Sequence, residues 1–102
     1  RGAGLSSAGR PLNLPALARS AAGTRVAVPG TALEVQALTE RLELVTESAY
    51  LLVLLEGQLI VDLPTGDFRV LTPGDSLQLS AELAVALQPV AGQAVLTWHA
   101  PR

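Results

Sequence analysis

The sequence predicts an all-β domain of the barrel or jelly-roll type, preceded by one short helix. From Thr24 onward, apolar residues recur at every second position, as in strands with one buried face. Turn-forming residues separate these runs at intervals of about 8–12 residues. The 102 residues are 49% hydrophobic, enough for one small domain. A sheet this apolar must close on itself or pair with another sheet, so we expect a sandwich or barrel.

The first eleven residues lack periodicity and are mostly small or polar, so we expect a flexible arm over 1–11 and one domain over 12–102. Four Arg precede the first acid, Glu34, giving +4 before that residue and 3 − 9 = −6 from it onward. A transit peptide and a nucleic-acid-binding arm are alternatives for this basic segment. The punctuation from Pro11 to Gly23 argues against the first, and the wide Arg spacing with an acidic body against the second.

A short helix is predicted near residues 14–22. Asn13 can cap its N-terminus, and Pro15 suits its first turn. Gly23 supplies a left-handed stop. We therefore expect the helix to end just before the β pattern begins.

The period-two runs predict seven or eight short strands. Leu63-Pro-Thr-Gly-Asp67 has the composition of a hairpin loop, and Thr72-Pro-Gly-Asp75 that of a tight turn. The alternating apolar positions that define the strands are Leu33/Val35/Ala37, Leu42/Leu44, Leu59/Val61/Leu63, Phe68/Val70, Leu77/Leu79, Val85/Leu87 and Val95/Thr97.

One strand is apolar on both faces. Its run from Ala49 to Leu55 has seven residues, against roughly 20 for a membrane-spanning helix. Both faces should therefore be covered within a protein, one by the interior and the other by the helix or a second subunit. We expect a cytoplasmic protein without membrane contact.

Composition removes most common catalytic sites. The chain has no Lys, so Schiff-base chemistry and the Lys-containing phosphate loop are excluded. It has no Cys and one His, which excludes disulfides, thiolate nucleophiles and metal sites needing two imidazoles from one chain. The absence of Cys is compatible with either redox compartment.

The segments from Tyr50 to Leu63 and from Phe68 to Leu79 resemble the conserved barrel of small single-domain cupins, including bacterial members. The resemblance rests on Leu-Glu-Gly57, the hairpin that follows it, and the turn at Pro73-Gly74-Asp75. It covers about residues 31–99 and implies a cupin-type jelly roll.

The family's metal ligands are two His and a Glu before the first Gly, and one His after the Gly-Asp turn. None of these ligands is found at the matching position of this sequence, so the resemblance implies a metal-free cupin with no cofactor. Counting from Gly57 and Gly74, the corresponding positions hold Glu43 and Val45, or Leu44 and Thr46, followed by Tyr50 and Val85.

Two alternative catalytic sites stay open. Some cupin-fold epimerases work without metal, and Tyr50 with His99 offers an acid and a base. The simpler interpretation is that Tyr50 lines the barrel and His99 lies on the last strand or in the tail. A rebuilt metal site would use carboxylates and the single imidazole, from Glu40, Glu43, Glu47, Glu56 and His99.

The inward parity implied by the resemblance gives a mostly apolar interior, which includes Leu54. Side chains either fill this interior or leave an apolar pocket for a small ligand. Trp98 is more typical of a core or an interface than of a ligand platform. The candidate pocket residues are Tyr50, Leu52, Gln78, Val85, Leu87 and Trp98.

The opposite face of the same strand carries Leu51, Val53 and Leu55, and cupins commonly associate through such a face. We therefore predict a homodimer. The leading functional hypothesis is a non-catalytic, dimeric binding or structural module for a small apolar or amphipathic ligand. The alternatives are a cupin-type metal enzyme (oxygenase, isomerase or epimerase) with non-standard ligands, and the sensor half of a larger regulator.

Overall fold

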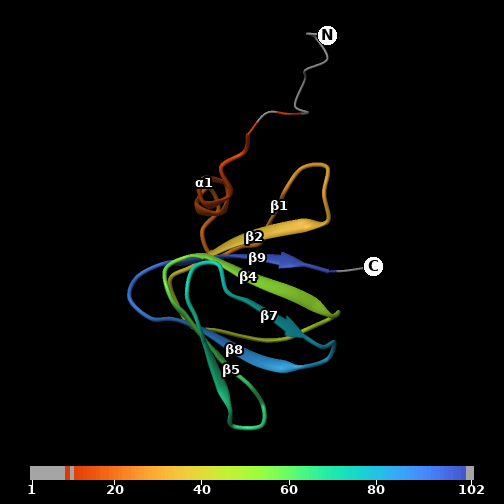
Figure 1. Ribbon diagram of the computed structural model, residues 1–102, viewed down its shortest axis with the longest axis vertical. Coiled ribbons are helices and arrows are strands. Elements are labelled where there is room, and N and C mark those ends of the chain that lie inside the picture. The colour runs from red at the N-terminus through yellow and green to blue at the C-terminus, as the bar shows by residue number, and fades with distance from the viewer. Residues whose placement is uncertain (1–8, 10, 101–102) are drawn as a thin grey trace.

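The computed structural model describes residue 9 and residues 11–100, which form two antiparallel sheets packed face to face and one short helix (Figure 1). Apart from residues 9 and 11, the predicted arm over 1–11 lies outside the described residues. The elements are α1 (Leu14–Arg19), β1 (Val26–Ala27), β2 (Leu33–Leu38), β3 (Leu42–Val45), β4 (Tyr50–Glu56), β5 (Leu59–Asp62), β6 (Phe68–Leu71), β7 (Ser76–Leu79), β8 (Ala84–Pro89) and β9 (Ala94–His99).

Helix α1 begins as predicted and ends three residues early. The Asn13 side chain accepts a hydrogen bond from the Ala16 amide at 2.9 Å, and Pro15 occupies the first turn. Beyond Arg19 the chain turns, and the Gly23 amide donates to the Ala37 carbonyl at 2.8 Å. Residues 20–22 therefore connect the helix to the sheet. Among the described residues, no helix is long and apolar enough to cross a membrane.

The two sheets confirm the all-β jelly-roll prediction. One has the order β1-β2-β9-β4-β7 and the other β3-β8-β5-β6, with every pairing antiparallel. The described residues form nine strands, one or two more than predicted. The addition is β1, whose two residues pair with Glu34 and Val35. A strand of two residues is too short to show a period in the sequence.

Side chains fill the space between the sheets. Along β4, buried residues alternate with half-buried ones, and Tyr50, Leu52 and Leu54 point inward as the resemblance implied. The core continues across the facing sheet through β5 and β8. Its fully enclosed members include Leu52, Leu54, Leu59, Val61, Leu87, Leu96 and Trp98.

Helix α1 covers part of the outer face of the five-stranded sheet (Figure 1). Its buried Ala18 joins a second apolar cluster with Val35 and Val95, and Leu55 packs against that cluster. The predicted covering by the helix is therefore confirmed for Leu55. Leu51 and Val53 of the same outer face are half-buried and do not belong to this cluster.

Both predicted turns are present. In the β5–β6 hairpin, the Leu63 amide donates to the Asp67 carbonyl at 2.9 Å. In the next turn the Asp75 carboxylate accepts hydrogen bonds from the Thr72 amide at 2.8 Å and from the Thr72 hydroxyl at 3.0 Å. These two hydrogen bonds lower the pKa of Asp75 below its ordinary value, and the bond from the Thr72 amide has the larger effect. The turn is thus held most firmly when Asp75 is ionised.

Candidate functional site

An apolar groove of about 680 Å³ opens between the β4–β7 edge of one sheet and the β5–β6 hairpin of the other. Five of its twelve described lining residues are leucines, among them Leu63, Leu77, Leu79 and Leu83. This volume falls within the usual range for small-molecule sites. The remaining lining residues are Ala49, Tyr50, Leu51, Pro64, Thr65, Arg69, Gln78 and Ser80.

Arg69 is the one charged side chain among the described residues that line the groove. It pairs with Val61 across β5 and β6, and so lies on the face of its sheet that looks toward the other sheet. Its Nη1 donates to the Phe68 carbonyl at 2.9 Å. No carboxylate of the described part of the chain lies within 4.0 Å of it. A guanidinium in this state retains donors for an anion.

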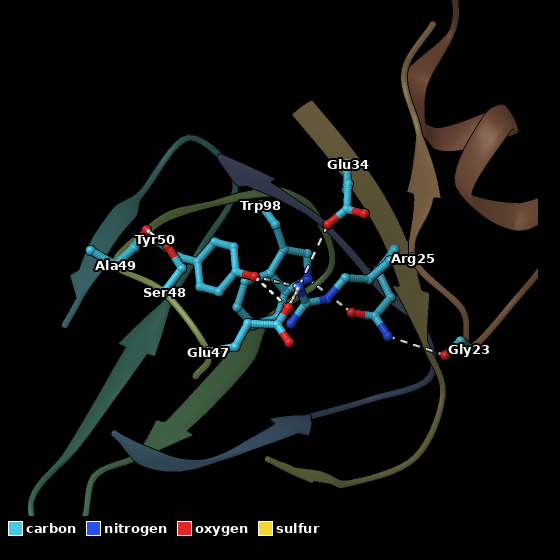
Figure 2. A network of polar contacts seen from close by, with 9 residues as sticks. Gly23, Arg25, Glu34, Glu47, Ser48, Ala49, Tyr50 and Trp98 are labelled. Atoms are coloured by element: carbon cyan, nitrogen blue, oxygen red, sulfur yellow. Dashed lines mark hydrogen bonds and ion pairs between the residues drawn. The ribbon is translucent and has the colours of Figure 1, made fainter. Parts of the chain in front are cut away.

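Beside the groove, Arg25 lies against two aromatic rings (Figure 2). Its guanidinium carbon is 4.0 Å from the ring centroid of Trp98 and 5.0 Å from that of Tyr50. Nη1 donates to the Tyr50 hydroxyl at 3.1 Å, and this hydroxyl donates to Glu47 Oε1 at 2.9 Å. Glu34 and Glu47 lie 3.5 and 4.0 Å from Nη1. Tyr50 thus belongs both to the groove and to this cluster.

A ring–ring contact and a series of hydrogen bonds fix the position of Tyr50 and Trp98. The rings of Tyr50 and Trp98 meet edge to face, with centroids 5.2 Å apart at an interplanar angle of 74°. Trp98 is fully buried, and its Nε1 donates to Gln36 Oε1 at 2.9 Å. Gln36 in turn donates to the Gly23 carbonyl at 3.1 Å. With every polar atom of this chain of contacts paired, the orientation of the Trp98 ring is fixed.

The structure brings together only two of the predicted pocket residues at the groove, Tyr50 and Gln78. Gln78 pairs with Leu51 and therefore lies on the outer face, not on the inward face that the prediction assumed. The other four are packed in the core between the sheets, where less than a tenth of each is exposed: Leu52, Val85, Leu87 and Trp98.

Three of the positions that hold metal ligands in the cupins that the sequence resembles, Thr46, Tyr50 and Val85, are engaged in other contacts. Val85 is apolar and buried in the core. The Thr46 hydroxyl donates to the Ser80 carbonyl at 2.6 Å and accepts from the Leu83 amide at 2.9 Å. The Tyr50 hydroxyl is bonded to Glu47 and Arg25, whose positive charge opposes a metal ion. These donors do not fit a divalent cation.

The two alternative catalytic constellations are not assembled. Within the described residues, no three His, Cys, Asp or Glu side chains are grouped so as to hold a metal ion. His99 pairs with Leu51, the residue next to Tyr50, so His99 and Tyr50 lie on opposite faces of the five-stranded sheet. Glu56 instead forms an ion pair with Arg19 at 2.9 Å.

The candidate-site residues that sequence reasoning missed are mainly arginines. Arg25 was counted only as part of a basic segment, and Arg69 only in the net charge of the residues from Glu34 onward. The alternation of Phe68 and Val70 predicted that these two residues face the core and that Arg69 faces outward, and this prediction was wrong. In the edge strand β6, Phe68 and Val70 are 58% and 48% exposed, and Arg69 pairs with the buried Val61. The sequence holds no local signal for Arg25 either, because its aromatic partners lie 25 and 73 positions away.

No family model and no curated protein matches the sequence. Solved structures do resemble it. Protein NMB1881 from Neisseria meningitidis is 12% identical, with a TM-score of 0.73 over 89% of this chain and 99% of that one. A protein of unknown function from Rhizobium leguminosarum is 16% identical, with a TM-score of 0.67 over 90% and 97%. A cupin-2 domain containing protein from Shewanella frigidimarina is 6% identical, with a TM-score of 0.63 over 78% and 82%. This chain has a cupin fold.

Proposed function

We propose that the protein is a metal-free, non-catalytic binding module for a small amphipathic molecule with an apolar body and one anionic group. The observation that carries the proposal is the groove of about 680 Å³, in whose apolar wall Arg69 is the single charged side chain contributed by the described part of the chain. An apolar site with one convergent charge favours a ligand of that description.

The chemistry of the lining supports binding rather than catalysis. Leucine side chains contribute burial of an apolar body, and Arg69 has donors to spare for a carboxylate or sulfonate. Acid and base catalysis would need titratable groups that face a common point. Tyr50 is the groove's ionisable hydroxyl, and it is already bonded to Glu47 and Arg25.

The test uses two fluorescent probes of nearly the same shape, 8-anilinonaphthalene-1-sulfonate, which carries one negative charge, and N-phenyl-1-naphthylamine, which is neutral. We expect the wild-type protein to bind both. Arg69→Ala should weaken binding of the sulfonate probe about fivefold to tenfold, the loss of one partly exposed charged hydrogen bond, and leave the neutral probe within about twofold.

The matched control is Arg41→Ala. Arg41 lies outside the groove, where its Nη1 contacts Asp62 at 3.0 Å and its Nε contacts Glu43 at 3.3 Å. This variant should bind both probes as the wild type does. Failure of the wild type to bind either probe, or equal weakening of both probes by Arg69→Ala, would contradict the proposal.

We also propose that the protein is a homodimer through the outer face of β4. Leu51 and Val53 support this, because both are half-buried and the α1 cluster covers only their neighbour Leu55. The wild type should sediment as a dimer at micromolar concentration. Val53→Arg should shift it toward the monomer, because burying the arginine charge in the interface costs its hydration. A monomeric wild type would defeat this part of the proposal.

A further inference from the structure

The recess that holds the Arg25 guanidinium has the composition of a receptor for an organic cation. Two aromatic rings supply negative π faces, and Glu34 and Glu47 supply full negative charges within 4.0 Å of Nη1. Cation–π contacts combined with carboxylates are how proteins recognise guanidinium and methylated ammonium groups. Four groups from three separate parts of the sequence converge on one cation.

Three of the four receptor groups, Trp98, Tyr50 and Glu47, have contacts that do not involve Arg25. The hydrogen bond from Trp98 to Gln36 and the bond from Gln36 to the Gly23 carbonyl fix the indole. The edge-to-face contact of the two rings and the bond from Tyr50 to Glu47 fix the phenol. Removal of the arginine side chain should therefore leave a preformed site rather than a collapsed one.

The segment that carries Arg25 is joined to the sheet by one short strand. Arg25 directly precedes β1, whose two residues pair only with β2 at the edge of the sheet. Its side chain is 22% exposed, so the recess reaches solvent. The recess also adjoins the groove, because Tyr50 belongs to both.

We infer that this recess is a binding site for a small organic cation bearing a guanidinium or methylated ammonium group, and that Arg25 occupies it as an internal ligand. An attached occupant competes with a free one at an effective concentration on the order of millimolar or above. The wild-type protein therefore binds the free cation weakly, and release of Arg25 exposes the full affinity. The inference does not depend on the identity of the groove ligand.

The test is titration of Arg25→Ala with methylguanidinium chloride at constant ionic strength. Trp98 is the only tryptophan, so its emission reports on the site directly. We expect a saturable change in emission with half-saturation at about 1–10 mM, the weak affinity typical of a very small ligand. The wild type should need at least about tenfold more methylguanidinium for the same response.

Three controls make the result specific. Urea has the shape of guanidinium without its charge, and should give no saturable response at the same concentrations. Arg41→Ala removes an arginine that has carboxylate partners but whose ion pairs lie outside the recess, and should behave as the wild type. Adding Glu47→Gln to Arg25→Ala should weaken methylguanidinium binding several-fold, because one carboxylate is lost.

If Arg25→Ala is destabilised, its melting temperature is measured by circular dichroism. Methylguanidinium, unlike urea, should then raise its melting temperature, since a ligand that binds only the folded state stabilises it. A folded Arg25→Ala protein without a saturable response, an equal response to urea, or an unfolded variant that methylguanidinium does not restore would each overturn the inference.

Discussion

Trp98→Ala is expected to lower the free energy of unfolding by about 3–5 kcal/mol, the usual cost of truncating a fully buried large aromatic side chain. The indole is fully buried between the sheets. Its removal leaves a cavity beneath Arg25 and Tyr50, and it also leaves Gln36 Oε1 without its donor in a buried position. A domain of this size has about 5–15 kcal/mol of stability in total, so the loss is a large share of it.

Urea unfolding followed by far-ultraviolet circular dichroism measures this change, because the variant has no tryptophan to report by fluorescence. Phe68→Ala is the matched control. Phe68 is also an aromatic residue of a strand, but it is 58% exposed at the sheet edge, so its loss should cost no more than about 0.5–1 kcal/mol. Trp98→Phe should fall between the two, since it retains most of the volume and loses only the donor to Gln36. Equal losses for Trp98→Ala and Phe68→Ala would contradict this account of the core.

The sequence was sufficient for the sheets because a strand's alternation is a local property. Leu59 and Val61 carry the period-two signal within their own strand, and the structure buries both. The turn at Thr72 and Asp75 is equally local, since its hydrogen bonds close over four residues. Features of this range can be predicted from a single chain.

The candidate sites depend on relations that no local pattern records. The groove is lined by residues of β7 and of the β5–β6 hairpin, which belong to different sheets. The recess around Arg25 requires the pairings of β1, β2, β9 and β4 to be known together, because its parts come from those elements and their flanks. The position of Gln78 shows the same limit. Gln78 alternates with Leu77 and Leu79 along β7 and therefore points outward. The inward-facing set of residues that was drawn from the resemblance to cupins does not hold for Gln78.

The glycine of the Leu-Glu-Gly turn, which carries much of the resemblance to cupins, has a steric reason to be glycine. Gly57 has a φ of 84°, and a Cβ added there would lie 2.5 Å from the Gln93 carbonyl oxygen and 3.0 Å from the Ala94 Cα. Both are backbone atoms at the start of β9, a central strand, and they cannot move aside without shifting that strand. The turn between β4 and β5 therefore packs directly on the backbone of the β8–β9 connection.

Gly57→Ala is accordingly expected to cost about 2–5 kcal/mol, the sum of the left-handed backbone penalty and of an overpacked contact. Gly66→Ala separates the two contributions. Gly66 has a similar φ of 90°, but a Cβ there would meet nothing within 4 Å, so only the backbone penalty of about 1–2 kcal/mol applies. Urea unfolding followed by Trp98 emission measures both variants under identical conditions. If the two substitutions cost the same, the contact between the β4–β5 turn and the β8–β9 connection contributes nothing, and backbone conformation alone explains the glycine. If Gly57→Ala costs more, the difference measures how closely these two loops must approach for the sheets to pack.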